Sequence, residues 1–498
     1  MFLSPPELSA VSMIHIKAAD FTISGFCFTM NSEAKNAKTG KDGILVKTAE
    51  EICMVFNETW KMEEYMLNTK WEDLPAEVQA RAVDCGIDLM IALIVGSHGE
   101  QFKNGIRMTE YLKGGDLEIP GCDKSFSFMG AAFAMGHASN SFDIDDGHNM
   151  IKGHPGTSFV GGVLAAALEK NVSYREYLTA LTVSYDLAVR MGLALQDHYG
   201  FLHSTGTYGA VATAAGIGRI FGFTKEQEKT AISMAEFHAP MTPVMRAVEY
   251  PSMNKDGVPF GAMVGTLAAL DTMAGESAKT HLLELPEYEK YLDSLGKVYE
   301  IMNLYFKPYT CCRWAHQPIQ ASIELMKEKK ISPSQVKHVK VHTFRSAAAL
   351  SKIVPHETDE AQYNIAFPVA SAIVHGDVGY RQICNAALDN PDVLEMMKRL
   401  EFVVDEALDA QFPEKRLASV EMELNDGTVY RTRVYAADGE ATDHVDHSWF
   451  VKKFNRILSP FLTDTGKTVV MRILTENLDA SVRDVVADVN VALKNYAN

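Results

Sequence analysis

The sequence predicts a mainly α-helical protein, with a large all-helical domain formed by both chain ends and a smaller α+β domain. Three observations predict this fold class. Apolar residues recur at helical spacing from about residue 50 to residue 300, they alternate with polar residues in several segments after Met302, and the helical spacing returns from Ser448 to the end. The boundaries that we expect are residues 46–301 and 447–498 for the helical domain and residues 302–446 for the α+β domain.

Capping residues predict where helices begin and end in the first part of the chain. Pro75 stands near the first position of one helix, where its missing amide is tolerated. Ser173 is followed three residues later by a glutamate, and Thr224 by a glutamine, so each predicts an N-cap. Gly222 is expected to end the helix before Thr224. That helix, over residues 207–221, is rich in Ala and Gly, which lets helix backbones approach closely.

Strand patterns appear only in the second part of the chain. Residues 339–343 and 420–424 alternate between apolar and polar side chains, as half-buried strands do. Residues 425–427, Asn-Asp-Gly, are a strong hairpin turn signal, so residues 429–435 are expected to return as the partner strand. Helices are also expected in this part, over residues 371–375 and 391–401.

The composition argues against several classes of protein. The 498 residues include 64 acidic and 47 basic side chains, which gives a formal net charge of −17, and 47% of the residues are hydrophobic. Such an acidic chain of ordinary globular composition is a poor partner for nucleic acid or an anionic membrane. The apolar stretch over residues 10–30 is interrupted by His15, Lys17 and Asp20, so it does not predict a membrane span. Residues 1–45 are expected to form a disordered leader.

The cysteines predict a reducing compartment, so we expect a cytoplasmic protein. Their number is odd, they are scattered, and no Cys-x-x-Cys pair occurs, which indicates neither a disulfide framework nor a zinc ribbon. They are Cys27, Cys53, Cys85, Cys122, Cys311, Cys312 and Cys384.

The densest group of polar residues lies between two apolar segments. It contains three carboxylates, Asp143, Asp145 and Asp146, and two imidazoles, His148 and His154. Three explanations stay open. The group could bind a divalent metal ion. It could form an acid–base site, in which burial and crowding move carboxylate pKa values towards neutrality. It could also serve only to cap helices and form turns.

Four other segments contain candidate binding or catalytic residues. His203 precedes the Ala/Gly-rich helix, whose N-terminal amides could bind an anion, although neighbouring Ser and Thr residues could simply cap it. Lys255 is a single lysine in a loop with Pro and Gly. Segment 307–316 contains a lysine, an arginine and two adjacent cysteines that are best explained as buried thiols. Segment 443–447 is rich in Asp and His, but it precedes a helix, so capping explains it better than metal binding.

Together these segments resemble the MmgE/PrpD family, which includes 2-methylcitrate dehydratase, cis-aconitate decarboxylase and iminodisuccinate epimerase. The resemblance extends from about Leu74 to Leu458. Residues 131–148 resemble the stretch that ends in the family's Asp-x-Asp-Asp-x-His loop, and His154-Pro155-Gly156 follows it as in the family. Residues 203–207 match its His-x-Thr-Gly-Thr element, and residues 306–316 resemble its Phe-Lys-x-Tyr-Pro-Cys-Cys segment. The joint order and spacing of these motifs carry the resemblance.

The resemblance implies an all-helical domain joined to a smaller α+β lid, usually in a homodimer. It also implies a small di- or tricarboxylate substrate in a cleft between the domains, with no metal ion and no redox cofactor. The catalytic residues that it implies are Asp143, His154, His203, Lys255 and Lys307, with Tyr250 as an alternative to Lys255 in the local alignment. The residues expected to bind substrate are His148, Tyr250, Cys312 and Arg313.

Three departures from the family pattern bear on the reaction. Gly147 stands where the family commonly has Thr, Cys312 where the mammalian decarboxylases carry a histidine, and residues 347–349, all Ala, where they carry a tyrosine. These changes argue against decarboxylation of cis-aconitate, and they leave dehydration and epimerisation open.

The reaction that we expect is a cofactor-free dehydration that begins with removal of a proton α to a carboxylate, as in a 2-methylcitrate dehydratase-like hydro-lyase. Lysine and arginine side chains would meet the negative charge that develops. His154 and His203 would act as acid and base, with Asp143 as a partner of one imidazole. The alternatives are an epimerase of an amino- or imino-dicarboxylate, a cis-aconitate decarboxylase, a metal-dependent hydrolase built on the Asp/His group, and a non-catalytic carboxylate-binding protein.

Overall fold

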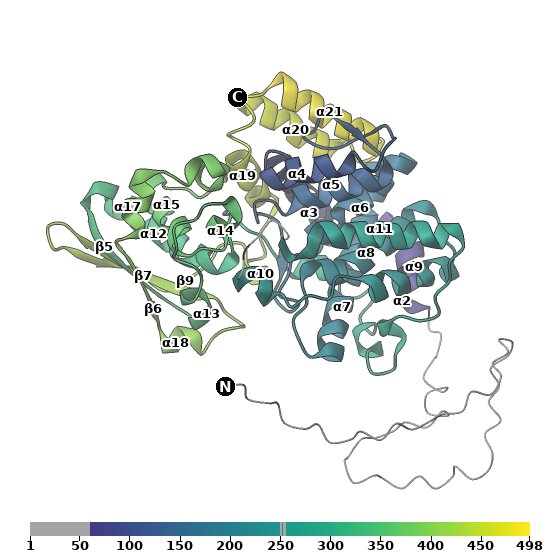
Figure 1. The fold of residues 1–498 in the computed structure, drawn as a ribbon, viewed down its shortest axis with the longest axis horizontal. Helices are drawn as coiled ribbons and strands as arrows, with labels where there is room; N and C mark the ends of the chain where they lie inside the picture. The colour runs from purple at the N-terminus through teal and green to yellow at the C-terminus, as the bar shows by residue number, and fades with distance from the viewer. Residues whose placement is uncertain (1–59, 250, 252–254) are drawn as a thin grey trace, which may run out of the picture. The chain divides into compact units, whose positions relative to one another are not determined.

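A computed structural model describes residues 60–498, with the exception of residues 250 and 252–254 (Figure 1). In this part of the chain the protein is mainly helical, with a small mixed sheet in the C-terminal region. These two features agree with the predicted fold class, and the two-domain boundaries stay a prediction. The expected leader, residues 1–45, and Tyr250 lie outside the described residues.

The helices up to residue 274 pack around α8. Helix α8 contacts α6, α7, α9 and α11, and α5 contacts α6 and α11. The approach of α11 to α8 requires a glycine, because a Cβ at Gly265 would lie 2.3 Å from the carbonyl oxygen of Ala210. The close packing expected from the Ala/Gly-rich helix is therefore confirmed. These helices are α2 (Lys61–Asn68), α3 (Ala76–Gly96), α4 (Glu100–Thr109), α5 (Phe128–Ser139), α6 (Pro155–Lys170), α7 (Tyr174–Tyr199), α8 (Thr205–Phe221), α9 (Lys225–His238), α10 (Met245–Glu249) and α11 (Val258–Ala274).

The helices at the C-terminal end pack against those near the beginning of the described chain (Figure 1). They are α19 (His447–Ile457), α20 (Asp464–Glu476) and α21 (Val482–Asn495). Both α19 and α20 contact α3, and α21 contacts α6 and α7. The Nζ of Lys453 on α19 donates a hydrogen bond to the buried carboxylate of Asp88 on α3 and another to the carbonyl oxygen of Ile144, at 2.7 Å. Lys453 thus connects α19 to the loop after α5.

The helix boundaries follow the predicted caps. Ser173 and Thr224 each accept a hydrogen bond from an amide in the first turn of α7 and α9. Gly222 ends α8 in a left-handed conformation with φ of 73°. In the Asp/His-rich segment before α19, Asp446 accepts a hydrogen bond from an amide of the first turn, so the capping explanation of this segment is confirmed.

The sheet has the strand order β6-β5-β7-β8, and β9 also pairs with β7. Strands β5 and β6 are parallel, whereas the other pairs are antiparallel. The predicted turn joins β7 to β8, and Gly427 in it has φ of 86°, a conformation that favours glycine. Helix α12 packs against β7, and α15 packs against α12 and α17. The bounds are β5 (Val336–Thr343), β6 (Leu400–Val404), β7 (Leu417–Leu424), β8 (Val429–Arg431), β9 (Tyr435–Ala436), α12 (His316–Lys329), α15 (Ala366–His375) and α17 (Pro391–Met397).

Two predicted elements differ from the structure. The helix expected over residues 391–401 ends at Met397, and β6 begins at Leu400 because residues 400–404 pair in parallel with β5. That pairing joins distant segments, so local helix preference does not determine it. The strand expected over residues 429–435 is divided into β8 and β9. The remaining short elements are β1 (Leu117–Glu118), β2 (Ser125–Phe126), β3 (Gly147–His148), β4 (Leu304–Tyr305), α13 (Arg345–Ala348), α14 (Thr358–Gln362), α16 (Tyr380–Ile383) and α18 (Glu406–Asp409).

Two described helices are long and apolar enough, by length and composition alone, to cross a membrane. They are α7 and the helical segment Lys255–Ala274. The most apolar window of α7 is 94% buried, as in the core helix of a soluble protein, whereas that of Lys255–Ala274 is 50% buried. Two such helices are weak evidence for a membrane protein.

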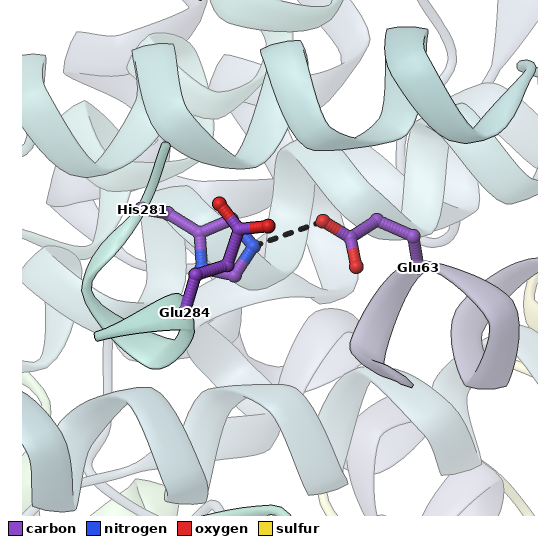
Figure 2. Close-up of side chains that lie close together, drawn as sticks. All are labelled: Glu63, His281 and Glu284. Atoms are coloured by element: carbon purple, nitrogen blue, oxygen red, sulfur yellow. Dashed lines mark hydrogen bonds and ion pairs between the residues drawn. The ribbon is translucent and has the colours of Figure 1, made fainter. Parts of the chain in front are cut away.

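Glu63, His281 and Glu284 form a buried cluster that connects α2 to the segment after α11 (Figure 2). Glu63 Oε1 lies 3.0 Å from His281 Nε2, and Lys229 Nζ lies 2.7 Å from Glu284 Oε1. Burial opposes both charges of the Glu63–His281 pair. Their mutual attraction outweighs it, so the pKa of Glu63 is lowered and the pKa of His281 is raised. Lys229 already supplies a cation beside the carboxylates, so we treat this cluster as a structural ion-pair group.

Replacing Glu63 with Gln is expected to lower the free energy of unfolding by about 1–3 kcal/mol at pH 6, because His281 loses its carboxylate partner. The contribution of Glu63 to the free energy of unfolding is present above its ordinary pKa of 4.5 and is lost on acidification. The His281 contribution is present below its ordinary pKa of 6.5 and is lost as the pH rises through the raised value. Urea unfolding at pH 6 and pH 9 should therefore show a larger effect at pH 6.

The neighbouring variant Glu64→Gln is the matched control for Glu63→Gln. Glu64 forms an ion pair with Lys225 in which the two side chains are 52% and 43% exposed, so its loss should change the free energy of unfolding by less than about 1 kcal/mol. Equal effects of the two variants, or an effect of Glu63→Gln that does not change with pH, would contradict the buried-pair interpretation.

Candidate active site

The loop between α5 and α6 is buried and is held by a short antiparallel sheet. Strand β3 in this loop pairs with β4, which lies far along the chain. Gly147 of β3 lies so close to the ring of Tyr305 on β4 that a Cβ at this position would be 2.2 Å away. Asp143, Asp145 and Asp146 are almost completely buried. The predicted Asp/His group is therefore part of the interior, where charges need partners.

His154 precedes α6 and lies among four charged side chains. Its Nδ1 is 3.1 Å from Asp145 Oδ2 and 3.1 Å from Lys307 Nζ. Its Nε2 is 3.8 Å from Asp143 Oδ1 and 3.6 Å from Asp256 Oδ2. Lys307 Nζ is also 3.0 Å from Asp143 Oδ1. One imidazole and one ammonium thus share a small space with three carboxylates.

These contacts favour the charged forms of the group. Burial and Lys307 disfavour a proton on His154, but Asp145 and Asp143 outweigh them and the pKa of His154 is raised. Burial opposes the charge of Asp145, yet Lys307 and His154 lower its pKa. Burial also opposes the charge of Lys307, yet Asp143 and Asp145 raise its pKa. By contrast, burial raises the pKa of Asp256.

Asp146 and His148 contact residues outside the group around His154 and Lys307. Asp146 accepts hydrogen bonds from the Gly156 amide and the Tyr185 hydroxyl, each at 3.1 Å. Burial, with the nearby charges of other aspartates, raises the pKa of Asp146 to about 7. The Nε2 of His148 is 3.5 Å from Glu300 Oε2. These two residues hold the loop to its surroundings.

A cavity of about 350 Å³ opens beside His154. The acid–base group contributes Asp143, His154 and Asp256 to its lining. Basic and aromatic side chains also line the cavity. These are Lys152, Arg313 and Arg416, together with Tyr305, Trp314, Tyr363 and Phe412.

Three cavity-lining residues have a left-handed backbone. The φ angles of Asp143, Lys152 and Asp256 are 51°, 52° and 46°. Non-glycine residues in this conformation are uncommon, and they concentrate at functional sites. Their position around one cavity supports its identification as the active site.

Asp143, Asp145 and His154 could share a metal ion, since one ligand atom from each lies within 4.8 Å of the others. Lys307 Nζ, however, lies 3.0 Å from Asp143 and 3.1 Å from His154, so it already supplies the positive charge that a metal ion would bring. The geometry of these described residues fits an acid–base site better than a metal site.

Comparison with known protein families identifies the chain. The N-terminal domain of the MmgE/PrpD family matches residues 61–293, and the C-terminal domain of the same family matches residues 309–479. The chain belongs to the MmgE/PrpD family. The predicted resemblance is therefore confirmed, over both domains of the family.

Curated relatives of this MmgE/PrpD chain include fungal proteins. The chain is 24% identical to the cis-aconitate decarboxylase-like protein oryM of Aspergillus oryzae, over 69% of this chain and 79% of the relative. It is 22% identical to the cis-aconitate decarboxylase of Aspergillus terreus, over 91% of this chain and 96% of the relative.

The family resemblance also implied roles for Lys307 and Lys255, and neither side chain lines the cavity in the described part of the protein. Lys307 is fully buried behind Asp143 and His154 and contacts both. Lys255 is 2% exposed and donates to the carbonyl oxygens of Asn140, at 2.9 Å, and Ser141, at 3.3 Å. Lys255 therefore holds the loop after α5, and its catalytic role stays a prediction.

His203 has no described contact with the acid–base group. Its Nε2 is 3.3 Å from the carbonyl oxygen of Leu195, and its ring packs against Tyr199 and Phe201. Burial lowers its pKa. It is not among the described cavity-lining residues, and no described contact joins it to His154. The predicted pairing of these two histidines as acid and base is thus not supported by their placement, and the role of His203 stays a prediction.

The residues that were expected to bind substrate do not all line the cavity. Cys312 and Arg313 line the cavity, whereas His148 does not. Cys311 and Cys312 are free and buried, as expected, and burial raises the pKa of Cys312 to about 12. Arg313 forms an ion pair within the C-terminal part of the chain, in which its Nη2 is 2.9 Å from Glu440 Oε1.

Sequence reasoning missed three charged residues of the cavity: Asp256, Lys152 and Arg416. Asp256 is next to Lys255 in a Gly-containing loop, and Lys152 lies inside the Asp/His segment itself. Their proximity in sequence to candidate site residues could therefore have indicated both. Arg416 precedes β7 and has no local motif. Its place at the cavity depends on how the sheet packs.

Proposed function

We propose that the protein is an enzyme that removes a proton α to a carboxylate of a small di- or tricarboxylic acid, and that it acts as a hydro-lyase. The observation that carries the proposal is the partly exposed His154, which is held between carboxylates and Lys307 and opens to a cavity that contains three basic side chains. The basic lining also explains how a chain of net charge −17 could bind an anion, since a cavity responds to local charge.

In this proposal Asp256 accepts the proton and His154 donates one. Asp256 lines the cavity, and its raised pKa suits a general base. The electron pair of the broken C–H bond forms the carbon–carbon double bond, the C–O bond breaks, and the hydroxyl leaves as water with the proton of His154. Lys307 and Arg313 stabilise the negative charge that develops on the carboxylate next to the reacting carbon.

Decarboxylation of cis-aconitate is the second candidate, because the Aspergillus terreus relative that aligns with 91% of the chain is named a cis-aconitate decarboxylase. Cys312 in the cavity, where the mammalian decarboxylases are expected to carry a histidine, favours dehydration. Epimerisation needs only two acid–base groups at one carbon, and Asp256 and His154 could also supply these.

A panel of di- and tricarboxylic acids, followed by proton NMR in D₂O, tests the proposal. Dehydration should give a vinyl signal and ultraviolet absorbance from a hydroxy-polycarboxylate, decarboxylation should release CO₂, and epimerisation should place deuterium at the α-carbon without loss of material. EDTA is expected to leave the rate unchanged. Absence of turnover and exchange with every acid would contradict the proposal, and inactivation by EDTA with rescue by a divalent ion would indicate a metal enzyme.

A homodimer in the cytoplasm also belongs to the proposal. Helix α11 exposes Phe260, Leu267 and Met273, each about half exposed, and exposed apolar side chains of this size support contact with a second copy. The five cysteines within the described residues are free, which supports a reducing compartment. Sedimentation equilibrium tests the dimer, since a monomer at micromolar concentration would contradict it.

A further inference from the structure

The cavity contains two basic side chains to which the proposed acid–base step gives no specific task. Lys152 belongs to the loop between α5 and α6, and Arg416 precedes β7. Arg416 is only 6% exposed, yet its Nε has no hydrogen-bond partner among the described residues. Lys152 forms no hydrogen bond or ion pair with the residues that the structure describes. A buried guanidinium nitrogen without a partner needs an acceptor.

The electrostatics of the pair favour an anion. Burial and the charge of Arg416 lower the pKa of Lys152 to about 8, although Glu414 and Glu440 act in the opposite direction. Glu440 Oε1 is 3.4 Å from Arg416 Nη1 but 2.9 Å from Arg313 Nη2, so its charge is shared with Arg313. A bound carboxylate would remove the repulsion between Lys152 and Arg416.

The backbone holds Lys152 in an unusual conformation. Its φ of 52° is rare for a lysine, and the adjacent Gly153 accepts a hydrogen bond from the amide of His148 at 2.9 Å. The same short loop therefore presents Lys152 and His154 to one cavity.

Tyr305 connects the basic pair to the acid–base group. The guanidinium of Arg416 lies 5.1 Å from the centroid of its ring. The charges of Lys307 and Asp143 also act on the Tyr305 hydroxyl. A single small molecule in a cavity of about 350 Å³ can therefore reach both groups.

We infer that Lys152 and Arg416 bind a carboxylate group of the substrate other than the one whose α-carbon reacts at His154. The inference rests on the proposed function and specifies its substrate class. The Nε and one Nη of a guanidinium can hold both oxygens of a carboxylate, and the ammonium adds a second charge. The enzyme should accordingly prefer acids with two or more carboxylates to monocarboxylic acids of similar size.

Isothermal titration calorimetry with tricarballylate, a tricarboxylate that carries no hydroxyl group to eliminate, tests the site independently of turnover. We expect the wild-type protein to bind tricarballylate, and Arg416→Gln and Lys152→Met each to weaken binding by about 10- to 100-fold, in line with loss of a charge-assisted hydrogen bond. Propionate should bind weakly to all three proteins. Arg431→Gln, a 75% exposed arginine outside the cavity, and Lys415→Met, an exposed lysine next to Arg416, are the matched controls.

The outcomes separate this inference from the proposed function. Unchanged affinity in both cavity variants, or no binding of tricarballylate to the wild-type protein, would overturn the carboxylate site. Specific loss of affinity with no turnover of any acid would support the site and contradict the proposed reaction. If Arg416→Gln does not fold, as judged by circular dichroism, the affinity of Lys152→Met alone tests the site, since Lys152 is only half-buried. A purely structural role of Lys152 would change the melting temperature and not the Kd for tricarballylate.

Discussion

His154→Ala is expected to lower kcat by about 10²–10⁴-fold, with the secondary structure unchanged, because it removes the proton donor of the site. The raised pKa of His154 keeps the imidazole protonated above its ordinary pKa of 6.5. The wild-type kcat should therefore fall as the pH rises through the raised value, and the variant should lack this fall. Rates across the pH range, measured with the acid that the NMR panel identifies, check both expectations.

The controls use other histidines of the same chain. His338→Ala removes a half-exposed side chain 3.5 Å from Glu401 and should leave kcat unchanged. His203→Ala compares the two histidines expected from the sequence, and a loss as large as that of His154→Ala would return His203 to a catalytic role. Unaltered kcat in His154→Ala would remove His154 from the mechanism.

Lys307→Met is expected to lower the free energy of unfolding by about 3–5 kcal/mol at pH 7 and to abolish detectable turnover. The variant leaves the buried carboxylates of Asp143 and Asp145 without their main cation. The lowered pKa of Asp145 gives stability that is present above its ordinary value of 3.8 and is lost on acidification. Because this loss occurs below the ordinary value, urea unfolding should show a smaller difference from wild type at about pH 2 than at pH 7.

Lys337→Met is the matched control for Lys307→Met. Lys337 is 58% exposed and pairs with Glu423 at 2.7 Å, so its removal should cost less than about 1 kcal/mol. A Lys307→Met protein as stable as this control would show that Asp143 and Asp145 do not depend on the buried ammonium.

The parts of the fold that depend on local signals were predictable. Capping residues such as Thr224, the left-handed Gly222 and the Asn-Asp-Gly turn each specify a boundary through their own backbone chemistry. The start of β6 was not predictable, because residues 400–404 become a strand only by pairing with β5. Parallel pairing between distant segments leaves no turn signal in the sequence.

The candidate site shows the same limit. The Asp/His segment was visible because its charges are close in sequence, and the structure places Asp143, Asp145 and His154 together. Lys307 and Asp256 reach this group from other parts of the chain. The family resemblance gave Lys307 a catalytic role, whereas the only signal for Asp256 was its position next to Lys255. Arg416 was missed for the same reason, since the packing of a strand brings it to the cavity.

The ion pair between Lys453 and Asp88 has a consequence for biosynthesis. The ribosome makes Asp88 and the loop that contains Ile144 long before it makes Lys453, which binds both. Until that late stretch emerges, Asp88 lacks the ammonium of Lys453, which opposes the rise in its pKa caused by burial. We therefore expect the nascent chain to complete its catalytic loop only when translation is almost finished, which couples the onset of activity to synthesis of the whole polypeptide.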